Sequence, residues 1–561
     1  MKPDPLTDSI AAGDWARAEA LARAHLSLKP DDMEVRRYLA LALERQNRLP
    51  EAFDTYQDLL ARLSSPPPSD IVHDLARLAF RLDQMDMAEK LYRFVVQAEP
   101  DNVAAIAGLA ASQRQQMKYD AAIDGLKAAL ATHPEDSELW NVLGTVVNAQ
   151  NDPYTALTFF DEALRLDPDN HQARFHRGIA HAELGDFDSS LSDLFACIDG
   201  FSDPSNIASV RLTTAQIALC AGKTDIAWPL YEARHKTGTA MEVHYPFTAP
   251  RWQPGKSLAG KRLFVSAEQG LGDEILFGTL LPDVIRDLGD ESLLNLGVEP
   301  RLVSLFQRSF PSAKVYAHRT RREDGRISRH FDGFDEAQTP IDQWALMADF
   351  CATYRPTPAD FPAHNAYLKP DPARIEHWQA WLNSLDNRPK VGILWKSLKT
   401  DIIRERYYSP FDDWEILLKR DDITVISLQY GDARAELDAA AARGLPIITP
   451  PDIDLKDDLD DLCALTCALD LTLGPANATT NIAAAAGART WIITSPNNWV
   501  QMGQVHHPWY PAATAFMPRD LTSWDEVMAR VDQALTALIN SSRHQRRGQG
   551  GGATAQEKLR S

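Results

Sequence analysis

The sequence predicts an all-α solenoid of helical repeats followed by an α/β half with two parallel sheets. Two observations lead to this fold class. Prolines recur at intervals of 36, 34, 34 and 34 residues, at Pro30, Pro66, Pro100, Pro134 and Pro168. From Lys261 onward, short apolar runs alternate with helical patterns, which is typical of parallel strands that helices cover on both faces.

A period of 34 residues is that of the tetratricopeptide repeat (TPR), a helix–turn–helix unit. The clearest unit runs from Ser137 to Asn170. Gly144 and Ala156 are small where its two helices should cross, and Phe160 should fill the space beside them. The register repeats in the preceding units, which a generic helical bundle would not maintain. One unit cannot bury its apolar face alone, so we expect a stacked solenoid over residues 1–238 with a concave, protein-binding groove.

Composition limits the kinds of partner and the compartment. The 561 residues suffice for three or four domains. A net charge of -20 argues against binding of nucleic acid or an anionic membrane, although a local basic pocket remains possible. No apolar run approaches the roughly 20 residues of a membrane span, and the first ten residues lack the apolar core of a secretory signal. We therefore expect a cytoplasmic protein.

The five cysteines are widely spread and odd in number, which does not indicate a set of disulfides. Cys463 and Cys467 are four residues apart in a predicted apolar helix. This spacing would suit a pair of metal ligands, but buried thiols explain it better. We expect no metal site.

The second half divides into a linker, two Rossmann-like domains and a tail. Three prolines and two glycines in Tyr245–Gly260 predict a linker over 239–260. Strands KRLFVSA, LLNLGVE and AKVYA, with helices at Ile275–Leu288 and 341–354, predict the first domain, 261–375. A second series of strands and helices, from VGILWK to the helix at 524–540, predicts the domain 376–540. The polar, Gly-rich residues 541–561 should be a disordered tail.

The loop Ala267–Glu274 (AEQGLGDE) follows the first strand, at the sheet edge where ligands bind in open parallel sheets. Gly270 and Gly272 would let the backbone approach a ligand, and the next helix N-terminus would offer N–H groups to an anion. Asp273 and Glu274 are both candidates for a general base. Helix capping explains both carboxylates equally well, and spacing alone does not separate the two roles.

A basic cluster follows the first strand of the second series, in the segment WKSLKTDIIRER. It consists of Lys396, Ser397, Lys399, Arg404 and Arg406. In so acidic a chain these groups favour binding of a phosphate or a carboxylate, with a solvated basic loop as the alternative.

A third loop, GPANATTNIAAAAG (Gly474–Gly487), again follows a predicted strand. Asn477, Thr479 and Thr480 supply caps where a helix should begin, which would present backbone N–H groups to a phosphate. Capping alone would also explain these residues. Three anion-suited loops that meet at one cleft are a stronger indication than any single loop.

The order of these parts resembles bacterial TPR proteins fused to a glycosyltransferase-B (GT-B) domain, similar to the heptosyltransferase-like family 9. The matching segments, in order, are AWPLYEARH, PFTAPRW, FVSAEQGLGDEILF, VGILWKS, ISLQYGD, ALDLTLGPANATTNIAAAAG and HHPWYP. They cover most of Ala227–Tyr510. Alphaproteobacterial members with EQGLGDE resemble flagellin glycosyltransferases, which transfer nonulosonic acids such as pseudaminic acid.

The resemblance implies roles for individual residues. The catalytic base of the family matches Asp273, with Glu274 beside it. The implied donor-binding set is Gly270, Gly272, Lys396, Ser397, Arg404, Arg406, Asn477, Thr479, Thr480 and Asn481. Many relatives have Asp-Thr followed four residues later by His, where this chain has Ala476, Asn477 and Asn481. We favour a changed donor over an inactive enzyme, because a helix N-terminus binds phosphate through backbone N–H groups.

The function implied is a metal-independent protein O-glycosyltransferase without a cofactor. It would move a sugar from a nucleotide donor, CMP-linked by the family comparison, to Ser or Thr of an acceptor, flagellin, that the solenoid holds. One alternative is a non-catalytic TPR adaptor with a degenerate transferase domain. Another is a transferase for lipid or polysaccharide, which would need a basic or apolar membrane-facing patch.

Overall fold

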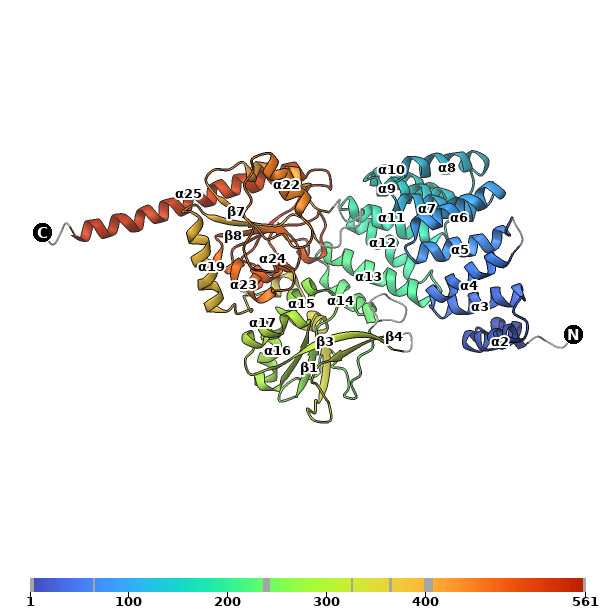
Figure 1. Cartoon of the computed structure of the whole chain (residues 1–561), viewed down its shortest axis with the longest axis horizontal. Helices are drawn as coiled ribbons and strands as arrows, with labels where there is room; N and C mark the ends of the chain where they lie inside the picture. The colour runs from blue at the N-terminus through green and yellow to red at the C-terminus, as the bar shows by residue number, and fades with distance from the viewer. Residues whose placement is uncertain are drawn as a thin grey trace. The chain divides into compact units, whose positions relative to one another are not determined.

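The computed structural model describes residues 5–63, 66–235, 243–323, 326–362, 366–397 and 407–557, with side chains up to residue 541. The chain divides into two compact units, Met1–Phe201 and Ser202–Ser561 (Figure 1). The first is a TPR solenoid and the second is α/β, which confirms the predicted fold class. No helix in the described ranges is long and apolar enough to cross a membrane.

The first unit is a stack of helix pairs. Its helices are α1 (Pro5–Ala11), α2 (Trp15–Leu28), α3 (Met33–Arg45), α4 (Leu49–Arg62), α5 (Ser69–Arg81), α6 (Met85–Ala98), α7 (Val103–Gln115), α8 (Tyr119–Thr132), α9 (Ser137–Ala149), α10 (Pro153–Leu166), α11 (His171–Glu183) and α12 (Phe187–Ile198). The first helix of a pair begins two or three residues after the periodic prolines. Asp32, Asn102, Asp136 and Asn170 cap four of these helices by accepting a backbone hydrogen bond.

The turn inside each pair requires one residue with a positive φ. This residue is Asn47 (59°), Asp83 (61°), Met117 (56°) or Asn151 (65°) in four of the turns. Asparagine and aspartate tolerate this left-handed conformation, whereas methionine adopts it at a cost. The turn conformation therefore recurs with the period that the prolines show in the sequence.

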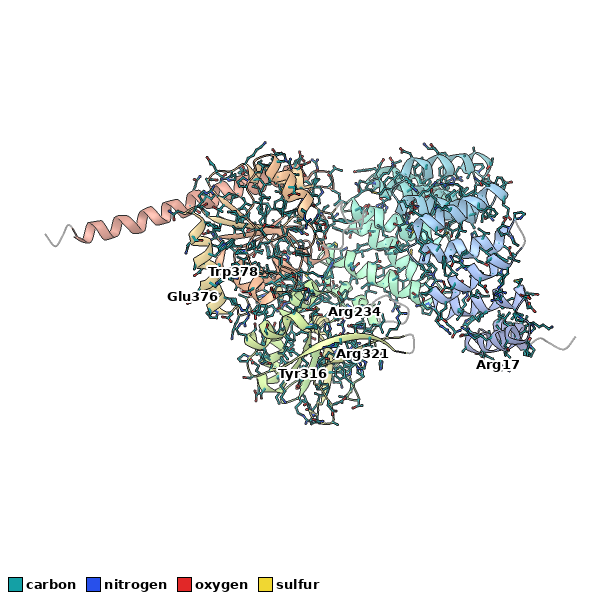
Figure 2. The ribbon with its side chains drawn as sticks, in the orientation of Figure 1. Arg17, Arg234, Tyr316, Arg321, Glu376 and Trp378 are labelled. Atoms are coloured by element: carbon teal, nitrogen blue, oxygen red, sulfur yellow. The ribbon has the colours of Figure 1, made fainter. Side chains whose placement is uncertain are left out.

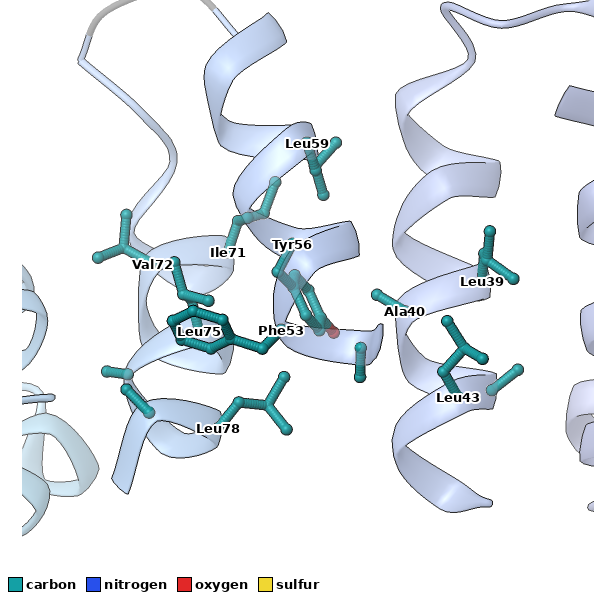
Figure 3. Packing of buried hydrophobic residues seen from close by; sticks show 14 of the residues in the cluster. Leu39, Ala40, Leu43, Phe53, Tyr56, Leu59, Ile71, Val72, Leu75 and Leu78 are labelled. Atoms are coloured by element: carbon teal, nitrogen blue, oxygen red, sulfur yellow. The ribbon is translucent and has the colours of Figure 1, made fainter. Parts of the chain in front are cut away.

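Packing within the pairs follows the predicted positions. A Cβ atom added to Gly144 would lie 2.5 Å from the ring of Phe160, so only glycine fits at this crossing of α9 and α10. Figure 3 shows the same layering earlier in the solenoid, where Tyr56 of α4 lies between Leu43 of α3 and Leu75 of α5. These contacts confirm the register of the repeats.

The second unit begins with one more helical pair, α13 (Pro204–Cys220) and α14 (Thr224–Tyr231), followed by η1 (Glu232–His235). The sequence prediction placed this pair in the solenoid, 1–238, but it belongs to the α/β unit. The reason is its packing: Trp228 Nε1 donates to Arg355 O (2.8 Å), and Cys220 Sγ lies 2.9 Å from Asn497 O. The pair thus contacts both α/β domains.

The first sheet has the strand order β4-β3-β2-β1-β5. Its strands are β1 (Leu263–Ser266), β2 (Leu294–Val298), β3 (Lys314–Glu323), β4 (Arg326–Phe331) and β5 (Gln343–Leu346). All neighbours are parallel except β3 and β4, which form an antiparallel pair at the edge. The expected linker is instead partly bound to this sheet, because residues 244 and 251 form bridges to β4 and β5 and Trp252 is buried.

The helices of this domain correct two predictions. The helix expected over Ile275–Leu288 is two helices, α15 (Leu271–Gly278) and α16 (Leu281–Leu288), because Pro282 cannot continue a helix from α15. The helix expected over 341–354 is β5 followed by η4 (Met347–Phe350) and α18 (Cys351–Tyr354). A short apolar run suits a buried strand as well as a helix, and here it pairs in register with β1. The first domain also contains η2 (Glu291–Leu293), η3 (Pro300–Leu302), α17 (Val303–Ser309) and η5 (Pro358–Asp360).

The second sheet is parallel throughout, with the order β10-β9-β8-β6-β7. Its strands are β6 (Lys390–Ile393), β7 (Thr424–Ser427), β8 (Leu471–Pro475), β9 (Thr490–Ile493) and β10 (Thr514–Phe516). Around it lie α19 (Pro372–Leu385), η6 (Phe411–Trp414), α21 (Glu415–Leu418), α22 (Arg434–Ala442), α23 (Leu459–Ala468), α24 (Ala478–Ala485), η7 (Trp499–Gln501) and α25 (Trp524–Glu557). The apolar segment 446–450 forms only a single bridge to this sheet, Ile426 to Ile448, in the described ranges.

The last helix differs from the expected disordered tail, because α25 continues from Trp524 to Glu557. Residues up to Ile539 anchor the first part of α25 in the core. Its last turns contain Gly548 and Gly550–Gly552, which are poor helix formers.

Candidate active site between the two α/β domains

Two of the three predicted anion-binding loops meet in the second unit. The loop after β1 leads into α15, the loop after β8 leads into α24, and these two helices pack against each other (Figure 1). Asn481 Nδ2 donates a hydrogen bond to the carbonyl oxygen of Gly272 (2.9 Å). A Cβ atom at Gly272 would lie 3.6 Å from the backbone nitrogen of Ala478. Glycine at this position therefore lets the two helix N-termini approach closely.

Asp273 lies at the third position of α15, beside this junction. Its Oδ2 accepts a hydrogen bond from the Gly270 N–H (3.3 Å), so the capping role expected from the sequence is present. Its Oδ1 has no hydrogen-bond partner among the described residues. Burial, together with the negative charges of Glu268 and Glu274, raises the pKa of Asp273 to about 6. Such a carboxylate is ionised at neutral pH and is still basic enough to accept a proton.

Glu274 points the other way, into the first domain. It is 1% exposed, and its Oε1 lies 2.7 Å from Nε2 of His318 on β3. Its Oε2 accepts from the backbone N–H of Glu299, after β2 (2.9 Å). Both oxygens are thus occupied by groups that fix α15 to the sheet, and this geometry fits a positioning residue rather than a base.

The second loop is closed by its own caps. Asn477 Oδ1 accepts from the N–H groups of Thr479 (3.0 Å) and Thr480 (3.3 Å), and Thr480 Oγ1 accepts from the Asn477 N–H (3.1 Å). Two donors remain at this terminus. The Ala478 N–H has no backbone or side-chain acceptor in the described ranges, and the buried Asn477 Nδ2 also has none.

The third predicted cluster is only partly described. Lys396 and Ser397 follow β6, which lies beside β8 in the sheet. Lys396 Nζ is paired with Glu436, and Ser397 Oγ lies 3.5 Å from the Tyr430 hydroxyl oxygen. Lys399, Arg404 and Arg406 lie outside the described residues.

Aromatic side chains that sequence reasoning did not assign to the site surround α15. Trp509 packs edge-on against Phe277 of α15, with ring centroids 5.6 Å apart. The next residue, Tyr510, is buried, and its hydroxyl has no hydrogen-bond partner in the described parts of the chain. Burial and the charge of Asp273 both raise the pKa of Tyr510. The only signal in the sequence was the HHPWYP segment of the family resemblance.

A buried ionic network holds the loop after β1. Arg234 (Figure 2) is 1% exposed, and its guanidinium bonds both oxygens of Glu268 (3.0 and 3.3 Å). It also bonds Asp349, which Arg251 contacts through two further hydrogen bonds. Burial would raise the pKa of Asp349, but His235, Arg234 and Arg251 together hold this pKa well below its usual range. The network joins AWPLYEARH, PFTAPRW and AEQGLGDE, and so fixes the loop that carries Asp273.

Part of this network has the spacing of a metal site. Ligand atoms of Glu232, His235 and Asp349 lie within 4.8 Å of one another. However, the Asp349 oxygens already accept hydrogen bonds from Arg234, Arg251 and the Leu346 N–H. The charge that a cation would supply is therefore already present, and the arrangement fits an ion-pair network.

A cavity of about 400 Å³ lies elsewhere, at the amino-terminal edge of the second sheet, near Val391, Leu471 and Leu538. Open parallel sheets bind ligands at the opposite, carboxyl-terminal edge. We therefore place the candidate site at the junction of α15 and α24.

Comparison with known proteins agrees with this organisation. A family model described as tetratricopeptide repeat matches residues 8–66, 108–170 and 149–200. The chain is 39% identical over 534 residues to Protein FlbA of Caulobacter vibrioides. The aligned region covers 94% of this chain and 88% of that protein. The chain belongs to the FlbA family. The FlbA match spans both units and therefore includes the junction of α15 and α24.

Two further likenesses are partial. A UDP-N-acetylglucosamine–peptide N-acetylglucosaminyltransferase of Giardia intestinalis is 28% identical over 119 residues, or 21% of this chain and 8% of that protein. A crystal structure of a tetratricopeptide repeat protein from Parabacteroides merdae also matches, at 16% identity and a TM-score of 0.37. The match covers 41% of this chain and 90% of the crystallised chain.

Proposed function

We propose that the chain is a glycosyltransferase that moves a sugar from a nucleotide donor to a hydroxyl group of a protein bound by the solenoid. The observation that carries this proposal is the meeting of two loops, one from each sheet, at the hydrogen bond from Asn481 to Gly272. Beside it lies Asp273, whose pKa is raised to about 6. A pair of Rossmann-like domains with their ligand-binding loops turned toward one junction is the arrangement expected of a GT-B enzyme.

Asp273 is the base in this mechanism. Its Oδ1 accepts the proton of an acceptor Ser or Thr hydroxyl, and the hydroxyl oxygen attacks the anomeric carbon. The bond from that carbon to the donor phosphate oxygen breaks, and the bonding electrons leave with the phosphate. The Ala478 N–H and the N-terminal end of α24 stabilise this developing charge. Lys396 would contribute after exchanging Glu436 for the phosphate.

The finer assignments rest on the family resemblance. It favours a CMP-linked nonulosonic acid such as pseudaminic acid as the donor and flagellin as the acceptor. The Giardia relative supports a combination of peptide and nucleotide sugar by its printed name, although the likeness covers 8% of that protein.

A specific observation favours a second candidate, a non-catalytic adaptor. The N–H groups of Thr479 and Thr480 are bonded to Asn477, and the Asn481 amide is bonded to Gly272. Fewer donors are therefore left for a phosphate than in an uncapped helix terminus. This candidate predicts that no nucleotide sugar binds.

Binding of the donor separates the two candidates. We expect CMP- or UDP-sugars to raise the melting temperature of the purified chain. Ala478→Pro should abolish this shift, because proline at the first position of a helix keeps the helix but removes the N–H group. Ala478→Gly, which retains the N–H, is the matched control and should keep the shift. Failure of every nucleotide sugar to stabilise the wild-type chain would favour the adaptor.

A further inference from the structure

The first helices of successive repeats form one layer of the solenoid. Helices α7, α9 and α11 each pack against the next in this layer, in addition to their partners within the pairs (Figure 1). In a stacked repeat array, the layer with the closer helix spacing is the inner, concave one. Side chains on this layer are therefore available to a bound polypeptide.

Arg114, in the last turn of α7, carries a charge that the protein leaves unpaired. Its guanidinium makes no hydrogen bond or ion pair within the described ranges, although burial lowers its pKa. It is not among the fully enclosed polar groups, so its nitrogens reach solvent. A largely buried cation without a counter-charge costs folding free energy, and such groups are normally paired.

The buried carboxylates in the described part of the solenoid, Glu44, Glu89 and Asp193, all form ion pairs. Glu44 forms ion pairs with Arg77 and Arg81, and the two oxygens of Asp193 accept hydrogen bonds from Nε and Nη2 of Arg177. Arg114 differs from these groups, because it has no counter-charge within the described ranges.

Polar groups around Arg114 do not neutralise it. On the next helices, the His176 Nδ1 lies 2.8 Å from Asn141 Oδ1 and its Nε2 lies 3.1 Å from Gln172 Nε2. Burial and the charge of Arg114 lower the pKa of His176 to about 4, so this histidine is neutral. This part of the layer thus offers a cation without a counter-charge among the described residues.

We propose that Arg114 is a binding site for an acidic side chain of the partner polypeptide. Charge complementarity identifies the ligand group, because a guanidinium binds a carboxylate through two parallel hydrogen bonds. The inference rests on the proposed role of the solenoid in holding an acceptor protein. It adds the chemistry that the acceptor segment must carry.

Selection from a random 12-residue peptide library displayed on phage tests this site without any assumption about catalysis. The full-length wild-type chain should enrich peptides with Asp or Glu at one fixed position. Arg114→Gln should remove this preference and weaken binding of a selected peptide about tenfold or more. Arg114→Lys, which keeps the charge without the planar geometry, should retain part of the affinity. Arg165→Gln, an exposed arginine on α10, is the matched control and should change nothing.

Three results would overturn the proposal. They are selection without an acidic preference, the same preference with Arg114→Gln, and equal binding of a selected peptide and its version with Gln in place of the acidic residue. The melting temperature of Arg114→Gln provides a further readout. It should be unchanged or raised, because no partner loses its counter-charge, whereas a purely structural arginine would lower it. If the wild-type chain selects acidic peptides but transfers no sugar, the proposed function is contradicted, whereas the binding site at Arg114 is supported.

Discussion

The buried Arg234 supports the sharpest energetic prediction. Arg234→Met removes the bonds to Glu268 and Asp349 and replaces the side chain with an apolar one of similar length. Asp349 keeps Arg251, but among the described residues Glu268 retains only the hydrogen bond from the Ala348 N–H (3.1 Å), and Glu268 is 6% exposed. Leaving a buried charge without its partner costs about 3–5 kcal/mol. We expect the second unit to lose about this much of its free energy of unfolding.

Urea denaturation measures this loss when hydrogen exchange is the readout. Exchange in peptides from β1 and α15 reports the unfolding of the second unit alone. Arg262→Met is the control, because Arg262 forms an exposed ion pair with Asp342 and its replacement should cost far less than that of Arg234. The double variant Arg234→Met/Glu268→Gln should recover part of the loss, because it removes the unpaired charge. A loss with Arg234→Met no larger than with Arg262→Met would refute this reasoning.

Three further predictions concern individual side chains. Met117→Gly should stabilise the first unit by about 1 kcal/mol in thermal unfolding, because Met117 has a φ of 56°, which glycine adopts without strain, and its side chain is half-exposed. Destabilisation would contradict the strain at this turn. The pKa of Asp273, about 6, lies above that of an unfolded aspartate, so its ionisation destabilises the fold above pH 6 and not below about pH 4. Asp273→Asn should therefore raise the melting temperature at pH 8 and not at pH 4, and wild-type transfer should rise with pH through about 6; an unchanged stability profile would exclude the shifted carboxyl. Glu274→Leu should lower the free energy of unfolding in urea by about 1–3 kcal/mol, because it leaves the Glu299 N–H without an acceptor and His318 without its partner; an unchanged free energy of unfolding would be inconsistent with this placement.

The solenoid was predictable because its information is local and repeated. The prolines, the Asp or Asn caps two residues after several of them and the small residue at Gly144 all act within one repeat. The helix expected at 341–354 failed because its outcome depends on a distant partner. Gln343 and Leu346 pair with Leu263 and Ser266 on β1, and a single short apolar segment contains no signal of that pairing.

The candidate site was predictable in part. The loops after β1 and β8 were identified from their glycines and their position after strands, and they do meet. The different roles of the adjacent carboxylates Asp273 and Glu274 were not visible, because they depend on His318, which lies 44 residues further along the chain. The Arg234–Asp349 pair spans 115 residues and was likewise hidden from spacing arguments.

The central claim is that the chain glycosylates a partner protein through Asp273. Mass spectrometry of flagellin tests it most directly, in cells with the wild-type gene, without the gene and with Asp273→Ala at equal protein level. We predict Ser- or Thr-linked sugar masses on flagellin only with the wild-type chain. Unmodified flagellin in all three strains, or full modification with Asp273→Ala, would contradict the account.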